Sequence, residues 1–189
     1  LVTVGFLNPL QNLLTSSPWF IVTAYLVGLA LLLGGFRIAI ITLVCALGIV
    51  YVGLWSDTMV TLAATLVAAA LTVALGILVG VWIGRSKKAD RVIRPILDAG
   101  QVLPAFVYLV PFLGLFGATR FTAIMAAIVY AAPAAIKLVA DGIKGVPESI
   151  IESSIAAGSN TWQMITKVQL PSAKRALMLA TNQGLIYVL

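Results

Sequence analysis

The chain has 189 residues, of which 61% are hydrophobic and only 10% charged, and its mean hydropathy is +1.11. Soluble domains contain about 45–50% apolar and about 25% charged residues, so this composition indicates a protein that is solvated by a lipid bilayer. One cysteine, Cys45, excludes an internal disulfide, and the lack of histidine leaves little for a metal site or a histidine-based catalytic dyad, so we expect neither.

Apolar runs of about 20 residues predict membrane-spanning helices. The runs in chain order are 19–35, 38–55, 59–84, 102–117, 121–138 and an incomplete run that begins at 176. The sequence therefore predicts five spans and the start of a sixth, which makes an all-α membrane protein, a multi-span helical bundle. Because the chain begins with Leu and its last run stops at Leu189, we expect a fragment of a longer protein, truncated at the C-terminal end.

The basic residues predict the orientation of these spans, because cytoplasmic loops carry the excess of Lys and Arg. When the charged segment 85–94 is placed in the cytoplasm, eleven of the twelve basic residues fall on that side and only Arg120 falls outside. The net charge of +6 is then spread over the inner membrane face, where anionic lipid headgroups lie, and indicates no nucleic-acid partner.

The acidic residues argue against an ion-coupled carrier. All six lie in predicted loops or at span ends: Asp57, Asp90, Asp98, Asp141, Glu148 and Glu152. Carriers that couple to protons or ions usually place ionisable groups at mid-membrane depth. The sequence also lacks a nucleophile elbow and a phosphate-binding Gly-x-x-x-x-Gly-Lys-Ser/Thr loop, so we expect no catalytic residues and an energy source on another chain.

A polar segment, residues 152–171, interrupts the apolar sequence on the predicted cytoplasmic side. Pro147 and Glu148 are typical of a helix start, and Gly158 supplies the left-handed conformation that ends a helix. Asn160 and Gln163 are spaced as a cap that opens a second short helix, which ends at Leu170-Pro171. Two short helices bent around a glycine would fit a groove on another protein; an interfacial loop without a partner is the alternative.

The same segment resembles the cytoplasmic coupling motif of ATP-binding-cassette importer permeases, Glu-Ala-Ala, three residues, Gly, nine residues, Ile-x-Leu-Pro. The matching positions are Glu152, Ser153, Ser154, Gly158, Val168, Leu170 and Pro171, and the small residues Ala156 and Ala157 belong to the same stretch. Serines replace both alanines and valine replaces isoleucine. These replacements keep the side chains small or branched, so the spacing and character of the motif are retained.

The resemblance extends upstream and indicates a narrower group within these permeases. PILDAGQVLPAFVYLVPFLGLFG (95–117), AAPAAIKLVADGIKGVPESIIESS and KVQLPSAKRALMLATNQGL are similar to permeases for glycine betaine, proline betaine, choline and related osmolytes. The similarity covers residues 57–189, the permease core with its coupling loop at about 141–173. Residues 1–56 form separate N-terminal transmembrane spans.

This resemblance implies a type I importer permease fold with a cytoplasmic coupling helix. It implies three protein partners: an ATPase that binds ATP and Mg, a second permease subunit and an external solute-binding protein. The expected location is the prokaryotic cell (inner) membrane, and the expected solute is an osmolyte such as glycine betaine. Another small solute such as an amino acid, a secondary carrier, and a non-conducting assembly subunit remain as alternatives.

Three polar residues near apolar runs are candidates for the translocation path: Gln101, Tyr108 and Asn182. An interhelical hydrogen bond is the alternative for each. Pro104, Pro111 and Pro133 are candidate bends within spans. Gly76, Gly80 and Gly84 recur every four residues and predict close approach of another helix, either inside the subunit or in a second subunit.

Overall fold

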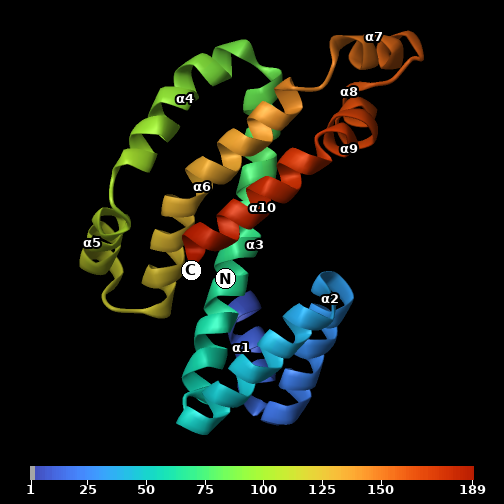
Figure 1. Ribbon diagram of the computed structural model, residues 1–189. Helices are drawn as coiled ribbons and strands as arrows, with labels where there is room; N and C mark the ends of the chain where they lie inside the picture. The colour runs from blue at the N-terminus through green and yellow to red at the C-terminus, as the bar shows by residue number, and fades with distance from the viewer. Residues whose placement is uncertain (1–2) are drawn as a thin grey trace. The chain divides into compact units, whose positions relative to one another are not determined.

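The computed structural model describes residues 3–189, and the regular structure in that range is helical, as predicted (Figure 1). Its elements are η1 (Thr3–Leu7), α1 (Asn8–Ser16), α2 (Trp19–Val52), α3 (Trp55–Arg85), α4 (Lys87–Val102), α5 (Ala105–Phe116), α6 (Arg120–Lys144), α7 (Glu148–Ala156), α8 (Thr161–Gln163), η2 (Met164–Gln169), α9 (Leu170–Ser172) and α10 (Lys174–Val188). The elements η1 and η2 are π-helical.

The chain forms two compact units, one ending at Val67 and the other comprising Ala68–Leu189. The boundary lies inside α3. The domain boundary predicted after residue 56 marks where the resemblance to known permeases begins, not where a compact unit ends. It therefore stays a prediction.

In the first unit, α2 consists of two helical arms that meet at Gly35. This residue has φ 77° and ψ −178°, a combination that only glycine adopts readily and that interrupts the helix. Figure 1 shows the chain turning back between the arms. The arms correspond to the first two predicted spans, and the loop predicted between them is reduced to one residue.

The number of membrane-length helices is smaller than predicted. In residues 3–189, three helices are long and apolar enough to cross a membrane, α2, α3 and α6; a bent pair, α4 with α5, brings the number to four if it is one span. The predicted span 102–117 is therefore wrong, because these residues do not form one straight helix, whereas the two arms of α2, counted above as one helix, correspond to the first two predicted spans.

A sharp bend between α4 and α5 replaces the predicted span 102–117. The two helices are bent by 93° at the break. Pro104 explains the break, because the residue before a proline is driven from the helical to the extended region, and Leu103 has φ −75° and ψ 136°. The hydroxyl of Tyr108 donates a hydrogen bond back to the carbonyl oxygen of Gly100, which braces the elbow. Of the three candidate bends, only Pro104 breaks a helix, since Pro111 and Pro133 lie inside α5 and α6.

The glycine stripe of α3 packs against α6 within the second unit. A Cβ built on Gly80 would lie 2.7 Å from Cβ of Val139 and 2.8 Å from the carbonyl oxygen of Ile136. Gly76 and Gly84 approach Ala135 and Ile143 in the same way. Of the two alternatives for the stripe, the structure shows packing inside the subunit, because α6 covers these three positions.

Helix α10 completes this packing. A Cβ on Gly142 of α6 would clash with Cβ of Ala176, so small residues allow the two helices to come close. Val139, Ile143, Ala173 and Ala180 form one buried cluster between them. The second unit is thus built around α6, which packs closely against both α3 and α10.

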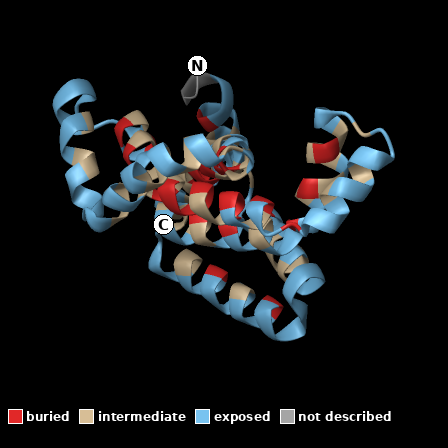
Figure 2. Ribbon diagram, turned by 90° about the horizontal axis from the view of Figure 1, so that it is seen from above, coloured by how far each residue is buried: buried red, intermediate tan, exposed pale blue. Residues whose placement is uncertain are grey.

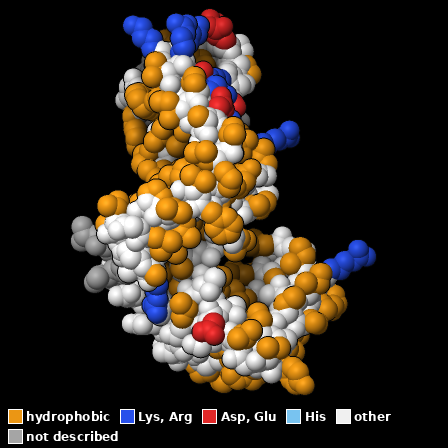
Figure 3. All heavy atoms as spheres, turned by 90° about the vertical axis from the view of Figure 1, so that its left-hand side faces the viewer, with side chains coloured by type: hydrophobic (Ala, Val, Ile, Leu, Met, Phe, Trp, Pro, Cys, Tyr) orange, Lys and Arg blue, Asp and Glu red, His pale blue; other side chains and the backbone are white. Residues whose placement is uncertain are grey.

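Most large apolar side chains outside this core are exposed. Pale blue, exposed residues cover most of the ribbon in Figure 2, and orange side chains cover much of the face in Figure 3. Examples are Leu33, Phe106 and Leu115, which are 86%, 79% and 76% exposed. Such a surface is stable in a hydrocarbon solvent rather than in water, as the composition predicts.

Candidate coupling site

Helix α7 begins and ends where the local sequence predicts. Its N-cap is Pro147, and Glu148 occupies the first turn, where a negative charge is stabilised by the helix dipole. At the other end Gly158 has φ +81°. The amide of Gly158 donates to the carbonyl of Ile155 at 2.9 Å, and the amide of Ser159 donates to that of Ser154 at 3.1 Å. These two bonds form a Schellman motif, so the predicted helix stop at Gly158 is confirmed.

Two serines add hydrogen bonds to this turn that alanines would lack. The hydroxyl of Ser154 donates to the hydroxyl of Ser159 at 2.8 Å, which ties the last turn of α7 to the residue beyond Gly158. The hydroxyl of Ser153 donates to the carbonyl of Ile150 at 3.0 Å. The replacement of alanine by serine therefore keeps the small size and also stabilises the bend.

The second short helix opens with the predicted cap. The side chain of Asn160 accepts from the amide of Gln163 at 2.8 Å, and the side chain of Gln163 accepts from the amide of Asn160 at 3.0 Å. This reciprocal pair is a capping box, so that prediction is confirmed. The predicted end at Leu170-Pro171 lies one residue short of the observed end. Proline is tolerated in a first helical turn, and α9 extends through Ser172 before the chain bends at Ala173.

The residues of the coupling motif divide into an exposed part and an anchoring part. Five of the exposed residues, on α7 and its turn, present small side chains around one carboxylate: Glu152, Ser153, Ala156, Ala157 and Gly158. Pro171 of α9 is exposed as well. Ser154, Val168 and Leu170 are half-buried. Leu170 packs against the buried cluster between α6 and α10, which fixes the segment to the second unit.

An unpredicted hydrogen bond anchors the segment from the other side. Gln169 is only 5% exposed, and its side-chain oxygen accepts a hydrogen bond from the guanidinium of Arg85 at the end of α3. A cavity of about 970 Å³ lies beside this pair. Its lining combines basic residues with apolar ones from the coupling segment: Arg85, Lys87, Arg91, Lys144, Ile151, Ile155 and Met164 among them.

We expect Gln169→Leu to destabilise the permease by about 1–3 kcal/mol, because the guanidinium of Arg85 loses its acceptor and the buried site loses a satisfied polar group. Thermal unfolding of the purified subunit in detergent measures this change. Gln169→Glu, which keeps a side-chain oxygen as acceptor for the guanidinium of Arg85, is the control. Equal unfolding temperatures for wild type and Gln169→Leu would contradict the anchoring role.

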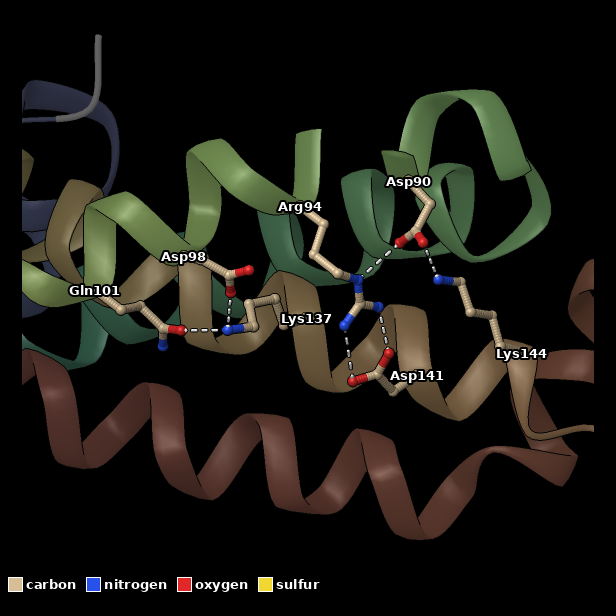
Figure 4. Close-up of polar contacts among 7 residues, drawn as sticks. All are labelled: Asp90, Arg94, Asp98, Gln101, Lys137, Asp141 and Lys144. Atoms are coloured by element: carbon tan, nitrogen blue, oxygen red, sulfur yellow. Dashed lines mark hydrogen bonds and ion pairs between the residues drawn. The ribbon is translucent and has the colours of Figure 1, made fainter. Parts of the chain in front are cut away.

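A line of charged side chains joins α4 to α6 (Figure 4). Asp90 pairs with Lys144 at 2.5 Å and with Arg94 at 3.0 Å, and Arg94 also binds Asp141. Farther along the two helices, the ammonium of Lys137 on α6 binds Asp98 of α4 and donates to the side-chain oxygen of Gln101 at 2.7 Å. The basic stretch expected to be a loop is therefore the start of a helix, which ion pairs fasten to α6.

These ion pairs shift the pKa values of Asp90 and Arg94 at the start of α4. The hydrogen bond from Lys144, together with that from Arg94, holds the pKa of Asp90 below its ordinary value. The hydrogen bond to Asp141 is the main reason that the pKa of Arg94 lies above its ordinary value, with the bond to Asp90 second. Both groups are thus charged over the whole physiological range of pH.

We expect Asp90 to stabilise the fold above the pKa of an unfolded aspartate and to lose this contribution as pH falls through its lowered folded pKa. The sign follows because the unfolded chain binds the proton more readily. Asp90→Asn removes the contribution, by less than about 1 kcal/mol because the pair is partly exposed to solvent. Unfolding temperatures of both proteins between pH 7 and pH 3 measure it, and a constant difference would contradict the assignment.

The three path candidates do not converge on one site. Gln101 is half-buried and lines a pocket of about 320 Å³. Tyr108 is half-buried, braces the α4–α5 elbow and contacts the ring of Tyr130, with centroids 6.0 Å apart. Asn182 is exposed, while its neighbour Gln183 lines the same pocket as Gln101. Sequence reasoning missed Gln183 because helix phase decides which of two adjacent polar residues faces inward.

Comparison with known proteins assigns the family. The family of binding-protein-dependent transport system inner membrane components matches residues 72–188. A glycine betaine/proline betaine transport system permease protein of Escherichia coli (strain K12) is 39% identical over 97% of this chain and 52% of its own length. A glycine betaine transport system permease protein of Bacillus subtilis (strain 168) is 34% identical over 98% of this chain and 66% of its own.

A trimethylamine N-oxide transport system permease protein of Pelagibacter ubique (strain HTCC1062) is 36% identical over 88% of this chain and 23% of its own length. The chain thus spans about half the length of the Escherichia coli relative. The family match covers α6, the whole coupling segment and α10, in which the geometry described above resides. The chain therefore belongs to the family of binding-protein-dependent transport system inner membrane components.

Proposed function

We propose that this chain is the transmembrane permease subunit of an ATP-driven importer for a small osmolyte. The observation that carries the proposal is the exposed coupling segment: α7, its Schellman turn at Gly158 and the surface of small residues from Glu152 to Ala157. Glu152, Ser153 and Ala156–Gly158 are exposed, so another protein has access to this surface.

The occupant of that surface is a cytoplasmic ATP-binding-cassette ATPase, which binds ATP and Mg. Closure of its nucleotide sites pulls on α7. The pull reaches the core through the connection from α6 and through Leu170 and Gln169, the two anchors of the segment. The permease itself performs no catalysis. A second permease subunit, identical or not, completes the path, and an external binding protein delivers the solute.

The chain lies in the inner membrane of a prokaryotic cell with its coupling loop in the cytoplasm. The distribution of charge supports this orientation. Arg85, Lys144 and Lys174 stand at the ends of α3, α6 and α10 that adjoin the coupling segment, whereas Arg120 stands at the opposite end of α6. A surplus of basic residues at one membrane face is typical of the cytoplasmic side.

The solute is an osmolyte such as glycine betaine, proline betaine or choline. The relatives from Escherichia coli and Bacillus subtilis are named for glycine betaine, and the one from Pelagibacter ubique for trimethylamine N-oxide. Both solutes carry a trimethylated nitrogen and a negatively charged oxygen. Another small solute, such as an amino acid, is the second candidate, and a secondary carrier or a non-conducting assembly subunit the third.

Uptake into sealed proteoliposomes tests the proposal. The full-length permease, its ATPase and its binding protein are reconstituted, and labelled glycine betaine, choline, methionine and a sugar are compared with and without ATP. We expect uptake of glycine betaine that requires ATP. Uptake of a different solute would contradict the substrate, and uptake driven by an ion gradient without ATP would contradict the importer itself.

A further inference from the structure

A small groove in the second unit combines three kinds of side chain that the coupling site does not use. It has a volume of about 320 Å³ and lies among α4, α6 and α10. Its lining residues are Gln101, Ala134, Lys137, Leu138, Asp141, Leu179, Gln183 and Tyr187. Pockets for drug-sized ligands occupy about 300–1,000 Å³, so this groove suits a small solute rather than a peptide.

Both signs of charge face the groove from one side of α6. Lys137 and Asp141 are four residues apart, which places them one above the other on the helix. An ammonium has three N–H donors, and Lys137 directs two of them to Asp98 and Gln101 (Figure 4). The third donor is left for an anionic group in the groove. The carboxylate of Asp141 binds Arg94 and retains lone pairs for a cation.

An aromatic ring completes the lining. Tyr187 is 38% exposed, and its ring contacts Tyr130 edge to face with centroids 5.5 Å apart. Tyr130 in turn contacts Tyr108, the residue that braces the elbow. This chain of three rings limits the movement of Tyr187. Aromatic faces attract quaternary ammonium groups, which cannot donate hydrogen bonds to a conventional acceptor.

We propose that this groove binds the zwitterionic solute in transit, with its carboxylate on Lys137 and its quaternary ammonium between Tyr187 and Asp141. The assignment rests on the proposed function. It follows from the groups left over after these pairings, because the third N–H of Lys137 favours a carboxylate, whereas the carboxylate of Asp141 and the ring of Tyr187 favour a quaternary ammonium, so a solute that carries both groups fits best. Gln101 and Gln183 line the groove from α4 and α10 and take no part in this charge pairing with the solute.

Protection of an introduced thiol tests this site. In the full-length complex, Cys45→Ser removes the native thiol, and Gln183→Cys places a new one in the groove. We expect a saturating concentration of glycine betaine to slow the reaction of this thiol with a charged alkylating reagent by about tenfold. Tetramethylammonium and acetate, which carry one charge each, give no protection. Thr181→Cys, exposed on α10 outside the groove, is the matched control and reacts at an unchanged rate.

Variants of two lysines on α6 distinguish solute binding from the ion pairing that holds α4 against α6. Lys137 and Lys144 each pair with an aspartate of α4, but only Lys137 lines the groove. We expect Lys137→Gln to abolish protection of the Gln183→Cys thiol and Lys144→Gln to preserve it. Where Lys137→Gln fails to assemble, Tyr187→Leu serves in its place, with Tyr187→Phe as the variant that keeps protection.

The outcomes separate this inference from the proposed function. If the wild-type complex does not import glycine betaine, the proposed function fails and the inference fails with it. If the complex imports glycine betaine but the Gln183→Cys thiol is not protected, only the inference fails. The same holds if protection persists in both Lys137→Gln and Tyr187→Leu.

Discussion

Gly158→Arg is expected to reduce solute uptake and solute-stimulated ATP hydrolysis strongly while the permease still folds. A Cβ at this position meets no atom within 4 Å, so the fold itself has room for a side chain. Its φ of +81° costs an L-residue roughly 1–2 kcal/mol, which a membrane protein of this size tolerates. A long cation on the turn nevertheless obstructs any groove that receives α7. We expect a fall of about tenfold or more in both activities, within the range of typical coupling free energies.

Two further variants separate backbone strain from obstruction. Gly158→Asn accepts the left-handed conformation at low cost and adds little bulk, so we expect it to retain most activity. Gly53 has the same kind of backbone, with φ +79° and no atom near its Cβ, but it ends α2 in the first unit. Gly53→Arg therefore imposes equal strain away from the coupling segment. Normal uptake by Gly158→Arg would contradict the docking role of this turn.

Gly80→Leu is expected to unfold the second unit or to prevent its insertion. The first carbon of the new side chain would lie 2.8 Å from the carbonyl oxygen of Ile136, which belongs to the backbone of α6 and cannot be avoided by a change of rotamer. Overpacking a well-packed core costs typically 1–3 kcal/mol, and a leucine between two helix backbones exceeds that range, so we expect more than about 3 kcal/mol.

The yield of monodisperse protein and its unfolding temperature in detergent measure this loss. The matched control is Gly28→Leu, since Gly28 lies inside α2 and a Cβ there meets nothing within 4 Å. We expect the control to unfold at nearly the wild-type temperature. If Gly80→Leu were as stable as Gly28→Leu, the close packing of α3 on α6 would be contradicted.

Features set by neighbouring residues could be predicted from the sequence. The stop at Gly158 and the cap of Asn160 and Gln163 depend on groups within a few positions of each other, so their chemistry is visible in the sequence. The glycine stripe was also visible as a repeat, and only its partner remained open. The coupling segment was identifiable for the same reason, because its motif and its turn lie within twenty residues.

Features that join distant segments could not be predicted. Arg85 and Gln169 are 84 positions apart, and Arg94 and Asp141 are 47 apart, so charge and polarity alone do not pair them. At Pro104 the sequence predicts a bend within a span, but for a different reason it does not predict that the span itself is broken there. Hydropathy reports that 102–117 prefers lipid, and it does not report the direction in which the chain runs through it. The groove between α4 and α10 could not be predicted either, because it depends both on contacts between distant segments and on the direction in which the chain runs.

Cross-linking from α7 tests the central claim most directly. In the full-length complex with Cys45→Ser, Ala157→Cys carries a short photoactivatable group on the exposed coupling surface. We expect it to capture the ATPase subunit, with a yield that changes between the nucleotide-free and ATP-bound states. Tyr51→Cys, which is 92% exposed in the first unit and lies toward the predicted external side, should capture no ATPase. Failure of the label at Ala157 to capture the ATPase in either state would contradict the assignment of α7 as the coupling helix.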